Sequence, residues 1–227
     1  MKRLLIAFVI LSLLLTAPAL ASTAQQRALD MFDACAFSAE YPDDPDNVQS
    51  KLVRWDTPIA VYVSGSPTDA DWNTLISFLT DLSRNVPNLP ALSITFDESS
   101  ANLTINFVPL KQMAGVFPTY VDGNWGMFHY TYSKYLITHA EIVVATDVTS
   151  QKDRNHLILE EVVGALGLPN DHGLNKKSIL YEDWTTVQQL CEEDWIMLNM
   201  LYDSRVKPGM NISQAHSALG VSGNDSN

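Results

Sequence analysis

The segment from residue 150 to residue 171 constrains the fold most, because it contains the signals for both ends of one helix. Ser150 is followed three residues later by Asp153, the spacing of a capping box at a helix start. Apolar residues continue to Leu166, and Gly167-Leu168-Pro169 then follows. Glycine readily takes the left-handed conformation that ends helices, and proline cannot continue one. The stretch "EEVVGALGLPND" (160–171) is therefore predicted to be a helix end and a sharp turn.

The rest of the chain alternates between helical and strand patterns. Helical spacing of apolar residues, with a cap at Thr68 or Asp69 in the second case, predicts helices over 24–37, 68–86 and 192–202. Apolar and β-branched runs predict strands over 58–65, 91–96, 101–110, 127–133 and 135–147. This order predicts an α/β (α+β) fold with a mixed, twisted sheet, helices on it and a C-terminal helix.

One domain over residues 22–210 accounts for all of these elements. Residues 109–127 hold Gly, Pro and Asn turn signals and are expected to form a loop. Residues 211–227 are rich in Ser, Gly and Asn, and we expect a disordered tail there. The sequence contains no internal repeat, glycine-rich phosphate loop or Gly-x-Ser-x-Gly motif.

The N-terminus has the pattern of a secretory signal peptide over residues 1–21. Lys2 and Arg3 precede an apolar run over 4–15, and Ala19 and Ala21 form an Ala-x-Ala cleavage site. Because this run is too short to span a bilayer comfortably, we expect cleavage and no stable membrane anchor afterwards. The expected location is the periplasm or the extracellular medium.

The charge and the cysteines restrict the partners and the chemistry. A net charge of −12 argues against nucleic acid and anionic membranes as partners. Cys35 and Cys191 are the two cysteines of the chain. In an oxidising compartment they are predicted to form one disulfide, with two separate thiols as the alternative.

The helix end at 160–171 resembles the active-site helix of metzincin-type zinc peptidases, which reads His-Glu-x-x-His-x-x-Gly-x-x-His. Glu161 stands at the position of the general base, Gly167 at the turn, and Asp171 directly after the third ligand. "SILY" (178–181) resembles the Ser-Ile-Met-Tyr of the methionine turn, with Leu180 in place of Met. The three histidine positions instead hold Glu160, Gly164 and Asn170.

The whole chain resembles more closely a family of secreted proteobacterial proteins, the domain-of-unknown-function 2927 family. The stretches that carry this resemblance are "LVRWDTPIAVYVSG", "NLTINFV", "EEVVGALGLPND", "SILY" and "LYDSRVKPGM". The family has no established activity, so the resemblance implies a fold and no reaction.

The leading hypothesis is a metzincin-like domain without catalytic activity, which acts as a binding or structural module. Its degenerate cleft is predicted to comprise Glu160, Gly164, Gly167, Asn170, Asp171, Leu180 and Tyr181, with Glu161 as catalytic base only in an active protein. The partner is unknown, and an envelope protein or a peptide fits this hypothesis. The alternative is an active metal- or carboxylate-dependent hydrolase that uses Glu160, Glu161 and Asp171, or a carboxylate pair with Glu182.

No cofactor is expected. His156 and Glu160, four residues apart on one helix face, are weak zinc candidates with His139 or with His172, which lies beyond the helix end. Glu160 and Glu161 also fit an ordinary solvated helix face, and Gly167 an ordinary cap. Gly164 lies inside the helix, where glycine costs about 1 kcal/mol relative to alanine. Close packing against it, for example by the 170–181 loop, would account for this glycine.

Overall fold

A single five-stranded mixed sheet forms the centre of the protein, for which a computed structural model describes residues 17–37 and 51–221. The strands are β1 (Ile59–Gly65), β2 (Leu92–Ile94), β3 (Leu103–Val108), β4 (Gly126–Ser133) and β5 (Leu136–Ala145). Their order is β2-β1-β3-β5-β4. The first four in this order are parallel, and β4 at the edge is antiparallel to β5.

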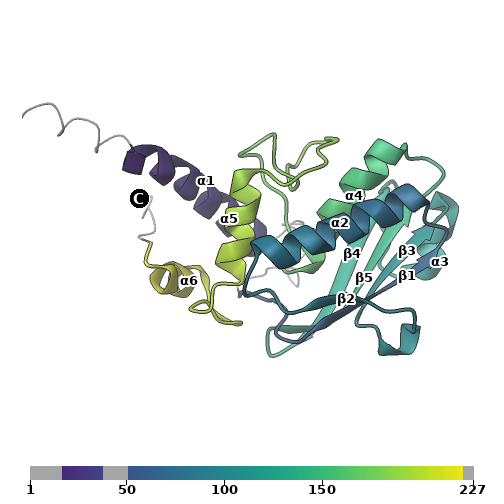
Figure 1. The fold of residues 1–227 in the computed structure, drawn as a ribbon, viewed down its shortest axis with the longest axis horizontal. Coiled ribbons are helices and arrows are strands. Elements are labelled where there is room, and N and C mark those ends of the chain that lie inside the picture. The colour runs from purple at the N-terminus through teal and green to yellow at the C-terminus, as the bar shows by residue number, and fades with distance from the viewer. Residues whose placement is uncertain (1–16, 38–50, 222–227) are drawn as a thin grey trace, which may run out of the picture.

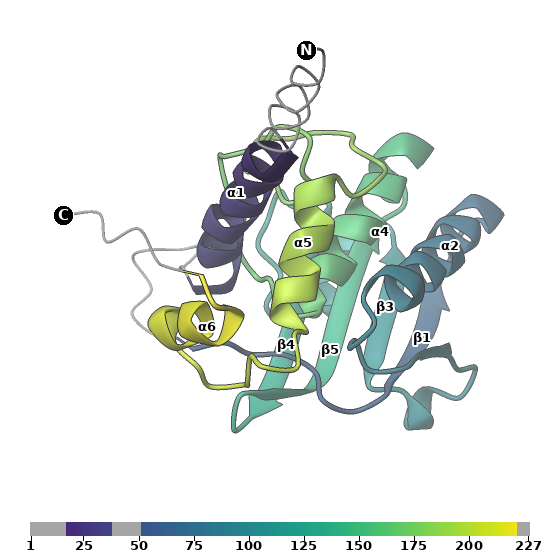
Figure 2. The same cartoon turned by 60° about the vertical axis from the view of Figure 1, so that its left-hand side comes forward.

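Helices cover one face of this sheet and extend beyond it (Figure 1). The helices are α1 (Ala17–Phe37), α2 (Asp69–Asn85), α3 (Met113–Val116), α4 (Gln151–Ala165), α5 (Glu192–Leu201) and α6 (Ile212–Leu219). The short α3 is the exception, because it packs on the opposite face of the sheet with Val143 and Ala145 of β5. Helices α2 and α4 pack together over the sheet, whereas α1 packs on α5 beside them (Figure 2). The main core lies between the sheet and these helices.

Local sequence signals explain where the two sheet-covering helices begin. Thr68 caps α2 in a capping box with Asp71, and Ser150 caps α4 in the same way with Asp153. The carboxylate of Asp71 is fully buried, and it accepts a hydrogen bond of 3.0 Å from Nε of Arg154 on α4. This buried ion pair fixes α4 against α2, and so fixes the helix whose end resembles the zinc-peptidase motif.

The end of α4 confirms the predicted turn. Leu166 is the C-cap, and Gly167 has a φ of +116°. A Cβ at position 167 would lie 2.4 Å from the carbonyl oxygen of Val53, so only glycine fits this close approach. Leu168 is fully buried after the turn.

The predicted fold class is confirmed by this topology, and two expectations about irregular segments need correction. Residues 212–219 form α6, capped by Asn211 and ended by Gly220, so the prediction of disorder from residue 211 is wrong there. A glutamine three residues after Asn211 completes a capping box, a signal that the Ser- and Asn-rich composition hid. The 109–127 loop contains α3 and a 3₁₀ turn, Leu110–Gln112. Residues 222–227 lie outside the described residues.

The N-terminal prediction is largely outside the described part of the chain. Residues 1–16 of the expected signal peptide are not described, and α1 begins at Ala17. Among the described helices, none has the length and hydropathy that a membrane crossing needs.

The predicted disulfide is absent from the structure, where Cys35 and Cys191 are separate thiols. Cys35 is buried near the end of α1, and Cys191 is the N-cap residue of α5. The Cys191 sulfur accepts a hydrogen bond of 3.5 Å from the side-chain amide of Asn175.

Candidate functional site

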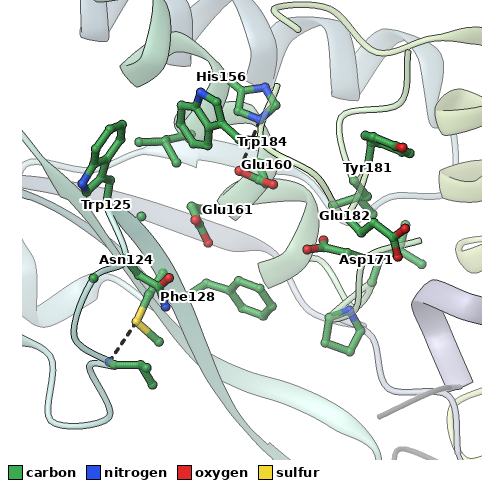
Figure 3. Close-up of a pocket in the computed structure, with 18 of the residues that line it drawn as sticks. Asn124, Trp125, Phe128, His156, Glu160, Glu161, Asp171, Tyr181, Glu182 and Trp184 are labelled. Atoms are coloured by element: carbon green, nitrogen blue, oxygen red, sulfur yellow. Dashed lines mark hydrogen bonds and ion pairs between the residues drawn. The ribbon is translucent and has the colours of Figure 1, made fainter. Parts of the chain in front are cut away.

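A cleft of about 770 Å³ lies between α4, the start of β4 and the loop that follows α4 (Figure 3). Three segments line the cleft. Helix α4 contributes His156, Leu157, Glu160 and Glu161, and β4 with the loop before it contributes Thr119, Val121, Gly123, Asn124, Trp125, Gly126, Met127, Phe128 and His129. The loop after α4 contributes Leu168, Pro169, Asp171, Leu180, Tyr181, Glu182, Asp183 and Trp184. The helix end and the "SILY" loop, which the sequence linked by resemblance, therefore face one space.

The two glutamates of α4 differ in their surroundings. Glu160 is partly exposed in the cleft, and its Oε2 lies 3.4 Å from Nε2 of His156. The other ring nitrogen of His156, Nδ1, donates a hydrogen bond of 2.7 Å to the carbonyl oxygen of Val187. Glu161 is only 7% exposed, which corrects its interpretation as part of a solvated face. A Cβ at Gly126 would lie 2.5 Å from Oε1 of Glu161, so this glycine lets β4 approach the carboxylate.

Asp171 faces these glutamates from the opposite side of the cleft (Figure 3). Although the residue as a whole is exposed, the protein around its carboxyl displaces water, and the charge of Glu182 lies close by. Both effects disfavour the ionised form and raise the pKa of Asp171 to about 6. Asp171 therefore changes charge close to neutral pH, where an ordinary aspartate does not.

The remaining walls combine aromatic rings with further acidic groups. The rings of Trp125 and Trp184 meet edge to face with centroids 5.3 Å apart, and Trp184 meets His156 at 5.6 Å. The hydroxyl of Tyr181 donates to Asp183 at 3.1 Å. Five carboxylates line the cleft, whereas none of its described lining residues is lysine or arginine. The cleft is therefore an anionic space with flat apolar walls, suited to a cationic ligand that also has apolar parts.

Three residues of the predicted cleft do not line it. Gly164 faces the ring of Phe128 on β4, and not the 170–181 loop that the sequence suggested as its neighbour. Gly167 packs against the backbone at Val53. Asn170 is 5% exposed, and its side-chain amide donates a hydrogen bond of 3.0 Å to the carbonyl oxygen of Cys35.

These positions do not fit the three-histidine zinc site of the metzincin motif. The place of a ligand at position 164 is taken by the Phe128 ring, and Asn170 is directed to α1. His139 lies on β5 and pairs with Glu141 at 3.5 Å. Within the described residues, no group of three or more His, Cys, Asp or Glu side chains is placed to hold an ion. The absence of a cofactor stays a prediction.

Comparison with known proteins identifies the family. The family model described as "Protein of unknown function (DUF2927)" matches residues 25–220, which is most of the chain. The chain belongs to the DUF2927 family. None of the curated proteins is significantly similar to it in sequence.

Two solved structures of myroilysin are similar to this DUF2927 protein. One has a TM-score of 0.43 at 10% sequence identity and covers 69% of this chain and 97% of the myroilysin chain. The other has a TM-score of 0.45 at 11% identity and covers 79% and 96%.

His172, Ser178 and Asp194 form a buried polar network beside the cleft. The sequence patterns did not predict this network. His172, one of the weak metal candidates, is 3% exposed, and its Nδ1 accepts a hydrogen bond from the backbone N–H of Leu174. Its Nε2–H therefore donates to the hydroxyl of Ser178 at 3.0 Å. That hydroxyl in turn donates to Oδ1 of Asp194 at 2.5 Å.

This network is structural, because each of its three side chains is almost fully buried and both ring nitrogens of His172 are used. Burial lowers the pKa of His172 to about 4, so the ring is neutral at physiological pH. Asp194 also accepts from the backbone N–H of Ile179. It thereby holds the "SILY" loop on the first turn of α5. The only sequence signal for this network was the acidic start of α5.

Proposed function

We propose that this DUF2927 protein is an exported binding module whose cleft takes an extended, basic peptide segment of an envelope partner without hydrolysing it. The single observation that carries the proposal is the lining of the cleft. Glu160, Glu161, Asp171, Glu182 and Asp183 surround one space, and the other lining residues provide aromatic and apolar walls without a compensating lysine or arginine.

The edge strand β4 supports a peptide as the class of ligand. It is the last strand in the sheet order, and in the described part of the chain it pairs only with β5. Its first residues form a wall of the cleft. An extended peptide can add to the open edge of a sheet through main-chain hydrogen bonds, while pockets beside the edge select its side chains. The acidic cleft would then select lysine or arginine.

Binding without hydrolysis is supported by the surroundings of the motif positions. Hydrolysis by a three-histidine zinc site needs side chains at positions that here are Glu160, Gly164 and Asn170. Phe128 fills the space at Gly164, and Asn170 is engaged with Cys35. Export to the periplasm or the medium is part of the same proposal, and it rests on the signal-peptide pattern of residues 1–21.

Calorimetric titration of the purified protein with short synthetic peptides tests this function. A peptide with two lysines should bind, and the same peptide with glutamines in their place should bind at least tenfold more weakly. Asp171→Asn and Glu160→Gln should each weaken binding of the lysine peptide. Glu98→Gln is the matched control, because Glu98 is exposed in the connection between β2 and β3, at the other edge of the sheet. Equal binding of both peptides would contradict the proposal.

A second candidate function is carboxylate-dependent hydrolysis. The observation in its favour is the raised pKa of Asp171, which lets this side chain act as an acid near neutral pH opposite the ionisable Glu160 and Glu161. Incubation with peptide and glycan substrates, followed by mass spectrometry, separates the two candidates. Product that forms with the wild type, and is lost with Asp171→Asn and with Glu161→Gln, would favour the hydrolase.

A further inference from the structure

Four aromatic rings form a row along β4 and its hairpin. Phe128 and Tyr130 are stacked with centroids 6.0 Å apart, Tyr130 and Tyr132 lie 6.3 Å apart, and Tyr132 and Tyr135 are stacked at 6.5 Å. Phe128 lines the cleft, whereas Tyr132 and Tyr135 at the other end are 53% and 40% exposed. The row therefore leads from the acidic cleft out to the solvent at the end of the hairpin.

The spacing of the row matches that of an extended peptide. Phe128, Tyr130 and Tyr132 occupy alternate positions of β4, and the contacts between their rings place them on one face of the strand. The pairing of β4 with β5 shifts register between Thr131 and Tyr132, within this row. Two residues of an extended chain span about 6.6 to 6.8 Å, close to each ring-to-ring distance. A strand that adds to the outer edge of β4 therefore brings every second side chain beside successive rings. A peptide that follows the whole row needs about six residues beyond the cleft.

The exposed end of the row is held in place by the backbone. Tyr135 has a φ of +67° in the tight turn between β4 and β5, a conformation that is uncommon for a bulky residue. Its carbonyl oxygen accepts a hydrogen bond of 3.3 Å from the N–H of Arg54. A Cβ at Gly209 would lie 2.6 Å from the ring of Tyr135, so this glycine makes room for the ring. The backbone and Gly209 therefore hold the exposed end of the row in place without a ligand.

We propose that the row of Phe128, Tyr130, Tyr132 and Tyr135 extends the peptide site, and that its ligand is an extended segment with arginine at alternate positions. This inference rests on the proposed function. The planar guanidinium group stacks on aromatic faces, and the strongly negative protein favours it over an acidic or neutral side chain. The protein itself contains this contact, because the Arg54 guanidinium lies 5.6 Å from the ring centre of Tyr202.

Two peptides test the inference with the full-length protein. The short one has four residues with lysine at two of them, enough to occupy the cleft. The long one continues it by six residues with arginine at every second position. The long peptide should bind about tenfold more tightly to the wild type. Tyr132→Ala should remove about three- to tenfold of the affinity for the long peptide and leave the short one unchanged. Tyr132→Phe, which keeps the ring, should retain the affinity.

Tyr62→Ala on β1 is the matched control, because β3 and β5 separate that strand from β4. It should change neither affinity, and circular dichroism and thermal unfolding should show that each variant is folded. Equal binding of the two peptides to the wild type, or an unchanged long-peptide affinity in Tyr132→Ala, would overturn the inference about the aromatic row and leave the proposed function standing. Failure of both peptides to bind the wild type would overturn the proposed function and this inference together.

Discussion

The ring of Phe128 fills the space beside Gly164 where a side chain from α4 would otherwise project. A Cβ at position 164 would lie 2.3 Å from Cε1 of the ring, well inside van der Waals contact. The close approach of β4 to α4 therefore requires glycine in the middle of a helix. In the zinc-peptidase motif this position carries a metal ligand, so the aromatic ring stands where the chemistry would need a histidine.

Gly164→Ala should destabilise the protein by about 1 to 2 kcal/mol, because displacement of the Phe128 ring outweighs the better helix propensity of alanine. In a Phe128→Ala background the ring is absent, and the same substitution should stabilise by up to about 1 kcal/mol. Chemical denaturation of the wild type, the two single variants and the double variant in a double-mutant cycle measures this coupling. Additive effects of the two substitutions would show that the ring does not restrict position 164.

Ser178→Ala should reduce the free energy of unfolding by about 2 kcal/mol. The substitution removes the acceptor for the Nε2–H of His172 and for the backbone N–H of Leu180, and it removes the donor to Asp194. Three buried polar groups therefore lose this partner. Urea denaturation of the variant and the wild type checks the value. Ser83→Ala is a suitable control, since the Ser83 hydroxyl donates to the Leu79 carbonyl of its own helix and joins no network between distant segments among the described residues. A loss equal to that of the control would contradict the structural role of the network.

His172 should make the protein less stable as the pH falls from about 6.5 to about 4. Its pKa is lowered to about 4 in the folded protein, whereas the unfolded chain takes up the proton near the ordinary value of 6.5. The unfolded state binds more protons in this window, so about 2 kcal/mol should be lost between pH 7 and pH 5. His172→Gln has no titrating group at this position, so its free energy of unfolding should fall by about 2 kcal/mol less than that of the wild type between pH 7 and pH 5. The raised pKa of Asp171 stabilises the folded protein as the pH falls from about 6 to 3.8. This contribution is present in the wild type and in His172→Gln, so it cancels in the comparison.

Peptide affinity should fall as the pH decreases from 7.5 to 5. Asp171 takes up a proton around pH 6, which removes one of the negative charges that face the ligand. The other ionisable groups that line the cleft are Glu160, Glu161, Glu182, Asp183, His129, His156 and Tyr181. Burial lowers the pKa of His156, so this ring gains its charge only at lower pH. Fluorescence titrations should show a three- to tenfold loss for the wild type, and a weaker, flatter profile for Asp171→Asn. Parallel profiles would assign the pH dependence to other groups.

Much of the fold followed from local signals in the sequence. The capping box at Ser150 and the glycine turn at Gly167 are set by residues close together in the chain, and they lie where the patterns predicted them. The cap of α2, predicted at Thr68 or Asp69, is Thr68. The helix α6 was missed because its Asn211 cap lies in a segment whose composition is typical of disorder.

The site was harder to predict, since it depends on contacts between distant segments. Resemblance brought Glu160, Glu161, Asp171, Leu180 and Tyr181 together, and all five line the cleft. The spacing of residues in the sequence did not predict that β4 forms a wall of the cleft. Gly164 meets Phe128 across 36 positions of the sequence, and Asn170 reaches back to the carbonyl of Cys35. Such packing has no local signature.

Binding and cleavage measured on the same sample test the central claim most directly. The lysine-containing peptide is titrated into the purified protein by calorimetry, and the mixture is then followed by mass spectrometry over a day. We predict binding that Glu160→Gln weakens and Glu98→Gln does not, with the peptide recovered intact. Cleavage of the peptide by the wild type that disappears in Glu161→Gln would contradict a binding module and identify an enzyme.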